Sequence, residues 1–380
     1  MKLECNMRSK FRGFYTNNEQ KNTKLFKDEK TLFVFDTNFI LDLYRNNDKT
    51  QSAMKEAVKA VQSKIWLPYF SALEYQRKRL DEIHSQANNI ITTLKPLDET
   101  ISTLQEKISK IEKTKLRYYT DTTEDIQIKL KAVKDDLEKF LNQKSQEIKE
   151  KNDQIIEHDS IRDWVDKIFQ DRIGSKFSEA ELSDLNSECQ KRFENLIPPG
   201  YEDKFKEGKK EAQFGYDGNL YHRAYGDFYV WKELLEKTKS LKVNTVFFIT
   251  NDEKQDMVHK TGYIKTGAHA SLREEIFKET PAKNFEILST YEFITGVSNA
   301  YRLDINQENI RVNFNEWDDA YDMHEKHQTV IEQEIEAAKI YQMFTQMKAQ
   351  KQAEKYNKNL SKLLRSMSWR LEAEDNETDE

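Results

Sequence analysis

The chain has 380 residues, enough for two or three domains of about 100 to 200 residues each, and it is 37% hydrophobic and 34% charged. This composition is too polar for one compact globule and indicates long solvated helices beside an ordinary core. The net charge of -6 argues against a protein that coats nucleic acid nonspecifically, so any nucleic-acid contact requires a local basic patch.

The cysteine content and the hydropathy bear on the compartment. Two cysteines, Cys5 and Cys189, provide neither a disulfide framework nor a zinc-binding set. The sequence contains no secretory signal pattern and no run of 18 apolar residues. We therefore expect a cytoplasmic protein without a membrane-spanning segment.

The segment TLFVFDTNFILDLYR, residues 31–45, predicts an apolar strand over 32–35 that runs into an acidic turn and then into an amphipathic helix. Asp36 stands where this strand ends. In an open α/β sheet, ligands bind at the carboxyl ends of the strands, because loops and helix N-termini converge there. The alternative is that Asp36 only caps the helix that follows.

Three further acids occupy comparable positions. A second predicted strand, 246–249, is followed by Asp252, and Asp227 lies in the first turn of a predicted helix just before that strand. Glu74 lies on a helix that follows a short apolar run. Clustered carboxylates repel one another unless cations bind between them, and Mg²⁺ and Mn²⁺ prefer oxygen ligands. The pattern predicts two such ions about 3.5–4 Å apart, with Asp36 and Asp252 as the central ligands.

Five segments carry a resemblance to a known family. In chain order, FVFDTNFILDLYR, LPYFSALEYQRKR, IPPGYEDKFK, YGDFYVWKE and FFITNDEKQDMV are similar to the successive motifs of a bacterial PIN-like nuclease domain. The resemblance covers roughly residues 30–82 and 197–297. It implies an α/β/α fold, often with a helical insertion, metal-dependent nuclease activity and, for some members, a place in phage-defence loci. Carried over position by position, it implies metal-binding acids at Asp36, Glu74, Asp227 and Asp252.

The sequence departs from the family pattern after the last acidic motif. Where relatives tend to have an Arg-Pro pair, this chain reads GAHASLREE, residues 267–275, and His269 or Arg273 is the candidate replacement.

Several polar residues are expected to assist the acids. Thr37, Asn38 and Asn251 should support the metal ligands by hydrogen bonds. Lysines just ahead of Asp227 form a basic cluster that can hold a phosphate backbone, although a solvated charge run mixed with glutamates is the alternative. The candidates for substrate binding are Lys204, Lys206, Lys210, Asn38, Asn251 and Arg77. Lys78 is accounted for equally well by an i,i+4 ion pair with Glu74.

The middle of the chain predicts a helical hairpin. Apolar residues recur in steps of four and three, as in the seam of a coiled coil, and the pattern breaks near residues 118–123 before a second seam begins. The two seams consist of Leu94, Leu97, Ile101, Leu104, Ile108 and Ile111, and of Ile126, Leu130, Val133, Leu137 and Phe140. The arm is either a docking or dimerisation device, or a spacer whose seam closes on itself.

Together these patterns predict a three-layer α/β/α PIN-like domain with a parallel sheet, interrupted by a long coiled-coil insertion and followed by a helical C-terminal extension. The expected divisions are a first nuclease part, a helical insertion, a second nuclease part and an extension with an acidic tail, at residues 1–82, 83–196, 197–300 and 301–380.

The expected function is that of a metal-dependent endonuclease acting on RNA or DNA, the effector of an anti-phage defence system, using Mg²⁺ or Mn²⁺ and assembling as a homo-oligomer or with a partner protein. The sequence contains no base-reading helix or stacking motif that decides between RNA and DNA. A catalytically silent scaffold that works through its coiled coil is one alternative. The other, a small-molecule phosphohydrolase, is disfavoured because the sequence has no glycine-rich phosphate loop.

Overall fold

The computed structural model describes residues 7–15, 23–115, 120–261, 264–307 and 310. The chain divides into two units, 1–310 and 311–380. From residue 311 onward, the predicted helical C-terminal extension with its acidic tail lies outside the described residues.

A four-stranded parallel sheet forms the centre of the first unit. Its strands, in spatial order, are β2 (Ile65–Trp66), β1 (Thr31–Phe35), β5 (Thr245–Ile249) and β8 (Asn284–Leu288). Strands β1 and β5 are neighbours, with Phe35 opposite Ile249, so their carboxyl ends lie side by side. The chain places β2 on one side of β1 and β5 with β8 on the other. The crevice at the ends of β1 and β5 is thus a topological switch point, where open α/β sheets bind ligands.

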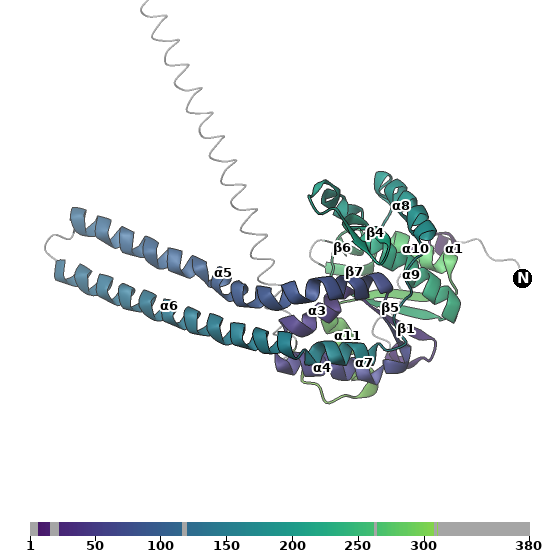
Figure 1. Ribbon diagram of the computed structural model, residues 1–380, viewed down its shortest axis with the longest axis horizontal. Helices are drawn as coiled ribbons and strands as arrows, with labels where there is room; N and C mark the ends of the chain where they lie inside the picture. Colours follow the sequence, from purple (N-terminus) through teal and green to yellow (C-terminus); the bar gives the residue numbers. More distant parts are fainter. Residues whose placement is uncertain (1–6, 16–22, 116–119, 262–263, 308–309, 311–380) are drawn as a thin grey trace, which may run out of the picture. The chain divides into compact units, whose positions relative to one another are not determined.

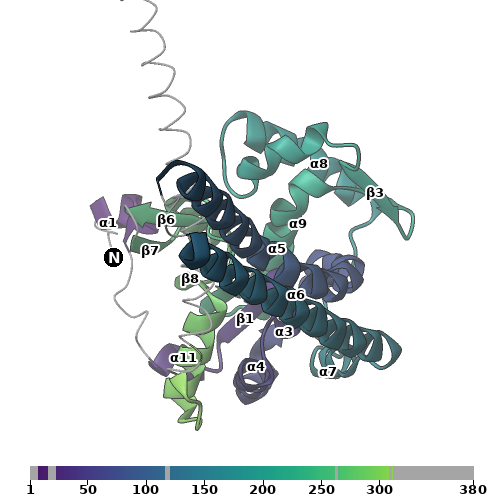
Figure 2. The same ribbon diagram turned by 90° about the vertical axis from the view of Figure 1, so that its left-hand side faces the viewer.

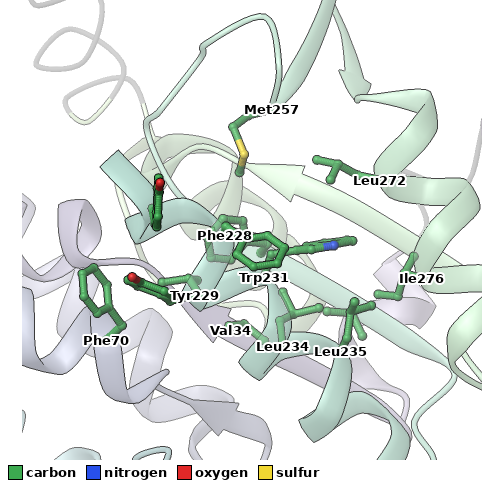
Figure 3. Close-up of a cluster of buried hydrophobic side chains, with 14 of the residues drawn as sticks. Val34, Phe70, Phe228, Tyr229, Trp231, Leu234, Leu235, Met257, Leu272 and Ile276 are labelled. Atoms are coloured by element: carbon green, nitrogen blue, oxygen red, sulfur yellow. The ribbon is translucent and has the colours of Figure 1, made fainter. Parts of the chain in front are cut away.

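One face of the sheet is covered by α9 (Gly226–Leu241) and α10 (Ala270–Glu279). Val34 of β1 packs in a buried cluster with Phe228 and Trp231 of α9 and Leu272 of α10 (Figure 3). Because α9 is apolar at these positions, burial of this face fixes the helix and its first turn relative to the ends of the strands.

The opposite face is an aromatic layer. Phe33 and Phe35 alternate with Val34 along β1 and so point away from α9. Phe35 packs against Phe39 of α3 (Thr37–Arg45) and Phe293 of α11 (Thr290–Tyr301), with ring centroids 4.6 and 5.3 Å apart. Helices on both faces of a parallel sheet confirm the three-layer α/β/α prediction, and Figure 1 shows the two helical layers on opposite sides of the strands.

The predicted helical hairpin is present. Helices α5 (Tyr69–Lys115) and α6 (Thr120–Glu157) lie side by side, run in opposite directions and project from the body of the unit (Figures 1 and 2). Two hydrogen bonds between the arms join Gln127 to Ser109 and Lys134 to Ser102, each 3.2 Å long.

Only part of the predicted second seam faces the first arm. Leu130 and Leu137 are half-buried, whereas Ile126, Val133 and Phe140 are 41, 55 and 52% exposed. The side chains of Leu94, Leu97 and Ile111 lie outside the described residues. The hairpin is therefore established and its coiled-coil packing remains a prediction.

The segment between the hairpin and the second half of the sheet belongs to the body. Helices α7 (Ser160–Ile168) and α8 (Glu179–Glu194) bury apolar residues there, including Val165, Leu182 and Cys189. Helix α5 also continues without a break past residue 82. The projecting part is thus formed by the two arms alone.

The remaining elements are short or peripheral. They include α1 (Met7–Lys10), α2 (Thr23–Lys27), α4 (Asp48–Ala60), the 3₁₀ helix η4 (Tyr201–Gly208), and two antiparallel hairpins, β3 (Gln213–Tyr216) with β4 (Asn219–His222) and β6 (Val258–Thr261) with β7 (Ile264–Ala268). Within the described ranges, no helix combines the length and the apolar character that crossing a membrane requires.

Candidate metal site

Asp36 lies at the carboxyl end of β1 and also caps α3. Its Oδ1 accepts a hydrogen bond from the backbone N–H of Thr37 (2.7 Å), and its Oδ2 accepts one from the hydroxyl of Thr250 (2.8 Å). Burial, followed by the negative charges of Glu74 and Asp227, raises the pKa of Asp36 to about 7. Asp36 therefore caps α3 and also lies close to other acids.

Asp36, Asp227 and Asp252 line one small pocket, closed by apolar side chains that include Trp231 and Met257. Asp227 comes from the first turn of α9, and Asp252 from the loop after β5. Burial and the charge of Asp227 raise the pKa of Asp252 above its ordinary value. Three of the four acids expected from the sequence thus converge at the switch point of the sheet.

The fourth acid, Glu74, lies one turn into α5. Glu233 of α9 anchors the start of this helix by accepting hydrogen bonds from the backbone N–H groups of Tyr69 (2.6 Å) and Phe70 (3.0 Å). The Glu74 carboxylate forms the i,i+4 ion pair with Lys78 at 2.6 Å and also raises the pKa of Asp36. The negative charge of Glu74 therefore acts on Asp36, although Glu74 already forms an ion pair with Lys78.

Lys254 lies among the acids and was not expected from the sequence. Its Nζ is 2.7 Å from Asp252 Oδ2 and 3.1 Å from both Asp227 Oδ2 and Asp203 Oδ2. Burial acts to lower the pKa of Lys254, but the three carboxylates outweigh it and raise that pKa. The ammonium group is thus held in its charged form.

Two further acids, Asp203 and Asp256, complete the surroundings. Asp203 is 2% exposed, and its Oδ2 pairs with both Lys206 and Lys254. Asp256 Oδ2 accepts from the backbone N–H of Gly200 (2.7 Å), which the left-handed φ of 95° at that glycine allows. Asp203 Oδ1 and Asp256 Oδ1 are buried and have no hydrogen-bond partner among the described residues.

Sequence reasoning missed Asp203, Lys254 and Asp256 because none of them directly ends a strand. The available signal was weaker: all three lie inside segments that carry the family resemblance, IPPGYEDKFK and FFITNDEKQDMV.

The donor atoms suit a hard divalent cation. All are carboxylate oxygens, the ligand type that Mg²⁺ and Mn²⁺ prefer, and the pocket beside Asp36 concentrates negative charge. Among the residues that the structure describes, no three His, Cys, Asp or Glu side chains are already gathered as a set of metal ligands. Part of the reason is that Lys254 lies between Asp227 and Asp252. The residues fit the ion by chemistry, and Asp36 is not among the three acids that form ion pairs with Lys254.

The expected supporting residues divide into two groups. Asn38 donates to Asp36 Oδ2 (3.3 Å), as expected, and Thr37 supports Asp36 through its backbone, while its hydroxyl donates to the carbonyl of Ser71. Asn251 does not contact the acids of the site. Its amide donates to Asp42 Oδ2 (2.5 Å), and its side-chain oxygen accepts from the backbone N–H of Thr290.

Thr250, one position earlier, has the role expected of Asn251. Its hydroxyl donates to Asp36 and accepts from the backbone N–H of Asp252 (3.0 Å). The reason is alternation: successive residues after a strand point to opposite sides, and composition alone does not show which side faces the site.

The candidate substrate-binding lysines have different surroundings. Lys206 is paired with Asp203, Lys204 and Lys210 are exposed, and Lys209 lies over the ring of Phe205, 4.7 Å from its centroid. The guanidinium carbon of Arg77 lies 3.3 Å from the centroid of the Phe214 ring. Burial and the charge of Arg223 lower the pKa of Arg77. The substrate contacts of these residues remain predictions.

The two candidates for the missing Arg-Pro pair are engaged elsewhere. Arg273 is 4% exposed and pairs with Glu286 at 2.6 Å. His269 caps α10 by accepting from the backbone N–H of Ser271 (3.2 Å). Arg273 is therefore placed as a buried ion-pair residue, and His269 begins a helix.

Comparison with known proteins gives one match. A family model described as a PIN-like domain matches residues 32–275, more than half of the chain, and this range extends from β1 into α10. It includes the six acids of the site, Asp36, Glu74, Asp203, Asp227, Asp252 and Asp256. No curated protein and no solved structure matches the chain.

Proposed function

The chain belongs to the PIN-like domain family, and from this membership and the acidic pocket we infer that it is a metal-dependent endonuclease that hydrolyses phosphodiester bonds in RNA or DNA. The observation that carries the proposal is the convergence of Asp36, Asp227 and Asp252 on one pocket at the ends of β1 and β5. Neighbouring carboxylates raise one another's pKa because their negative charges repel, and a bound cation balances this repulsion.

The chain's own residues account for the binding of such a cation. Asp36, Glu74, Asp227 and Asp252 would hold Mg²⁺ or Mn²⁺, and Thr250 and Asn38 fix the orientation of the Asp36 carboxylate. When bound, a divalent ion supplies charge stabilisation for the phosphate and makes water a better nucleophile at neutral pH.

A polymeric substrate is favoured by the exposed lysines near the site. Lys204 and Lys210 lie on or just after η4, the same element that carries Asp203. Exposed lysines hold phosphates by charge and so position a backbone without reading its sequence. They are therefore expected to bind RNA or DNA beside the acids.

We propose the biological setting from the motif resemblance and the mode of assembly from the helical hairpin. The protein is proposed as a cytoplasmic effector of an anti-phage defence system. It assembles as a homo-oligomer or with a partner protein of that system through the α5–α6 arm or the helices predicted for the C-terminal extension.

The test is incubation of the purified protein with labelled RNA, tRNA, and single- and double-stranded DNA, with Mg²⁺ or Mn²⁺ and with chelator. We expect cleavage of at least one substrate, dependent on the metal. Asp36→Asn and Asp252→Asn should lower the rate by at least about 100-fold, because each removes a charged ligand. Asp153→Asn, an exposed acid on α6, is the matched control. Cleavage by both site variants at the wild-type rate refutes the assignment.

One observation favours a second candidate, a catalytically silent scaffold. Lys254 already neutralises part of the acidic cluster without a metal. A folded wild-type protein that cleaves none of the four substrates and binds no Mn²⁺ would support the scaffold.

A further inference from the structure

Lys254 is bound as a cation by three separate parts of the fold. Its carboxylate partners are Asp203 of η4, Asp227 of α9 and Asp252 of the loop after β5, at 3.1, 3.1 and 2.7 Å. An ammonium group has three hydrogens to donate, so each can have its own carboxylate acceptor. The backbone N–H of Lys254 also donates to Asp252 Oδ1 at 3.0 Å, which fixes the start of the side chain.

The site therefore has two sides. On one side, Lys254 occupies the space between Asp203, Asp227 and Asp252. On the other side, Asp36 shares the pocket with Asp227 and Asp252. Asp227 and Asp252 use their Oδ2 atoms for Lys254.

A divalent ion on the Lys254 side would have to displace the ammonium group. If the ammonium group stayed, it and the divalent ion would compete for the same oxygens and repel each other at short range. If the ammonium group left, the ion would have to take over its contacts with all three carboxylates, because Asp203, which is 2% exposed, would otherwise keep only Lys206 as a partner. Buried carboxylates without compensating charge are costly.

We propose that Lys254 is the second cation of this site, so that the protein binds one divalent ion, on the side of Asp36, in place of the two ions expected from the acids alone. This inference rests on the proposed function. Lys254 acts as a positioning residue, because it holds Asp227 and Asp252 together from outside the pocket that receives the ion. It also supplies the positive charge that a second ion would bring.

The first test counts the bound ions. Mn²⁺ is titrated into the full-length protein, and the bound ions are counted by electron paramagnetic resonance of free Mn²⁺ and by calorimetry. Wild type should bind one ion, and so should Lys254→Arg, which keeps the charge. Lys254→Met should bind a second ion, because the carboxylates lose their internal cation. Lys206→Met is the matched control. Among the acids of the site, Lys206 pairs only with Asp203, so this variant should still bind one Mn²⁺ ion.

The second test needs no metal. In chelator, Lys254→Met should lower the melting temperature by several degrees more than Lys206→Met, and Mn²⁺ should restore it. Two ions bound by wild type, or one ion and an unchanged melting temperature in Lys254→Met, overturn the inference while leaving the nuclease proposal intact. Absence of Mn²⁺ binding and of cleavage in wild type overturns the nuclease proposal and, with it, the count of one ion.

Discussion

Asp36 shows how one residue serves folding and chemistry at the same time. The carboxylate accepts one hydrogen bond from the start of α3 and another from the Thr250 hydroxyl. Both hydrogen bonds favour its charged form, yet its pKa is raised to about 7. Burial and the neighbouring acids therefore outweigh the hydrogen bonds. Because its charged form is disfavoured in the folded state, ionised Asp36 destabilises the metal-free protein.

The consequence is a pH-dependent stability difference for Asp36→Asn. In the folded protein the proton is held up to about pH 7, whereas in the unfolded chain it leaves near pH 4, so wild type loses stability as the pH rises between these values. In chelator, Asp36→Asn should have the higher free energy of unfolding by about 2–4 kcal/mol at pH 8 and by little at pH 4. Urea denaturation at a series of pH values measures this, and a difference that is constant with pH would contradict it.

A second prediction at this scale concerns Thr250, whose hydroxyl joins Asp36 to the backbone of Asp252. Thr250→Val keeps the shape of the buried side chain and removes the hydroxyl. Loss of a hydrogen bond that orients a metal ligand should weaken Mn²⁺ binding by about 10- to 100-fold.

The matched control for this variant is Thr238→Val on α9, whose buried hydroxyl donates only to a helix carbonyl among the contacts that the structure records. Mn²⁺ titration of the two variants separates an effect on the site from a general effect of losing a buried hydroxyl. Equal Mn²⁺ affinity in both variants would show that Thr250 has no part in orienting Asp36.

At the scale of elements, the strands and helices with a strong local signal were predicted from the sequence. The apolar runs that became β1 and β5, and the positions of Asp36 and Asp252 after them, required only periodicity and the rule that strand ends gather ligands. The family match over residues 32–275 confirms the class of domain inferred from the motifs.

The parts that were not predicted depend on contacts distant in the sequence. Lys254 belongs to the site because Asp203, about fifty residues earlier, is brought beside it through the turn at Gly200. The facing of α6 also escaped prediction, since an apolar spacing of four and three fits more than one rotation of a helix. Leu130 and Leu137 are half-buried, while Val133 and Phe140 are exposed.

Element η4 allows a test of substrate binding. If the lysine cluster holds phosphates, the triple change of Lys204, Lys206 and Lys210 to Ala should weaken nucleic-acid binding and reduce the slope of log affinity against log salt. Each lost contact should remove about 0.9 from the slope for duplex DNA and about 0.7 for single strands. Three exposed lysines of α6, Lys129, Lys131 and Lys139, provide a control triple of equal charge.

Binding by fluorescence anisotropy at several salt concentrations decides between the two interpretations of the cluster. A slope that falls equally in both triples would indicate a general charge effect. An unchanged slope in the η4 triple would show that these lysines are only a solvated face.

At the scale of the whole molecule, the hairpin is the feature that the acidic site does not explain. It carries apolar side chains away from the inter-arm contact, including Leu104 (44% exposed) and Ile128 (66% exposed) in addition to Val133 and Phe140. Solvent exposure of such a series is unfavourable in proportion to its apolar area. Burial against another subunit or a partner protein would remove that cost, which is why we propose the arm as an assembly device.

The last prediction separates assembly from catalysis. Val133→Glu with Phe140→Lys should abolish assembly, measured by light scattering, because charges would replace the exposed apolar side chains. Helicity should persist, since both side chains are more than half exposed, and cleavage of a short substrate should also persist, because the acids come from other segments of the fold. Lys131→Glu with Glu138→Lys, on the same arm, controls for a rearrangement of surface charge that removes no apolar side chain. Wild-type and Val133/Phe140 variant proteins that are both monomers and retain the same partners on co-purification would identify the arm as a spacer whose seam closes on itself.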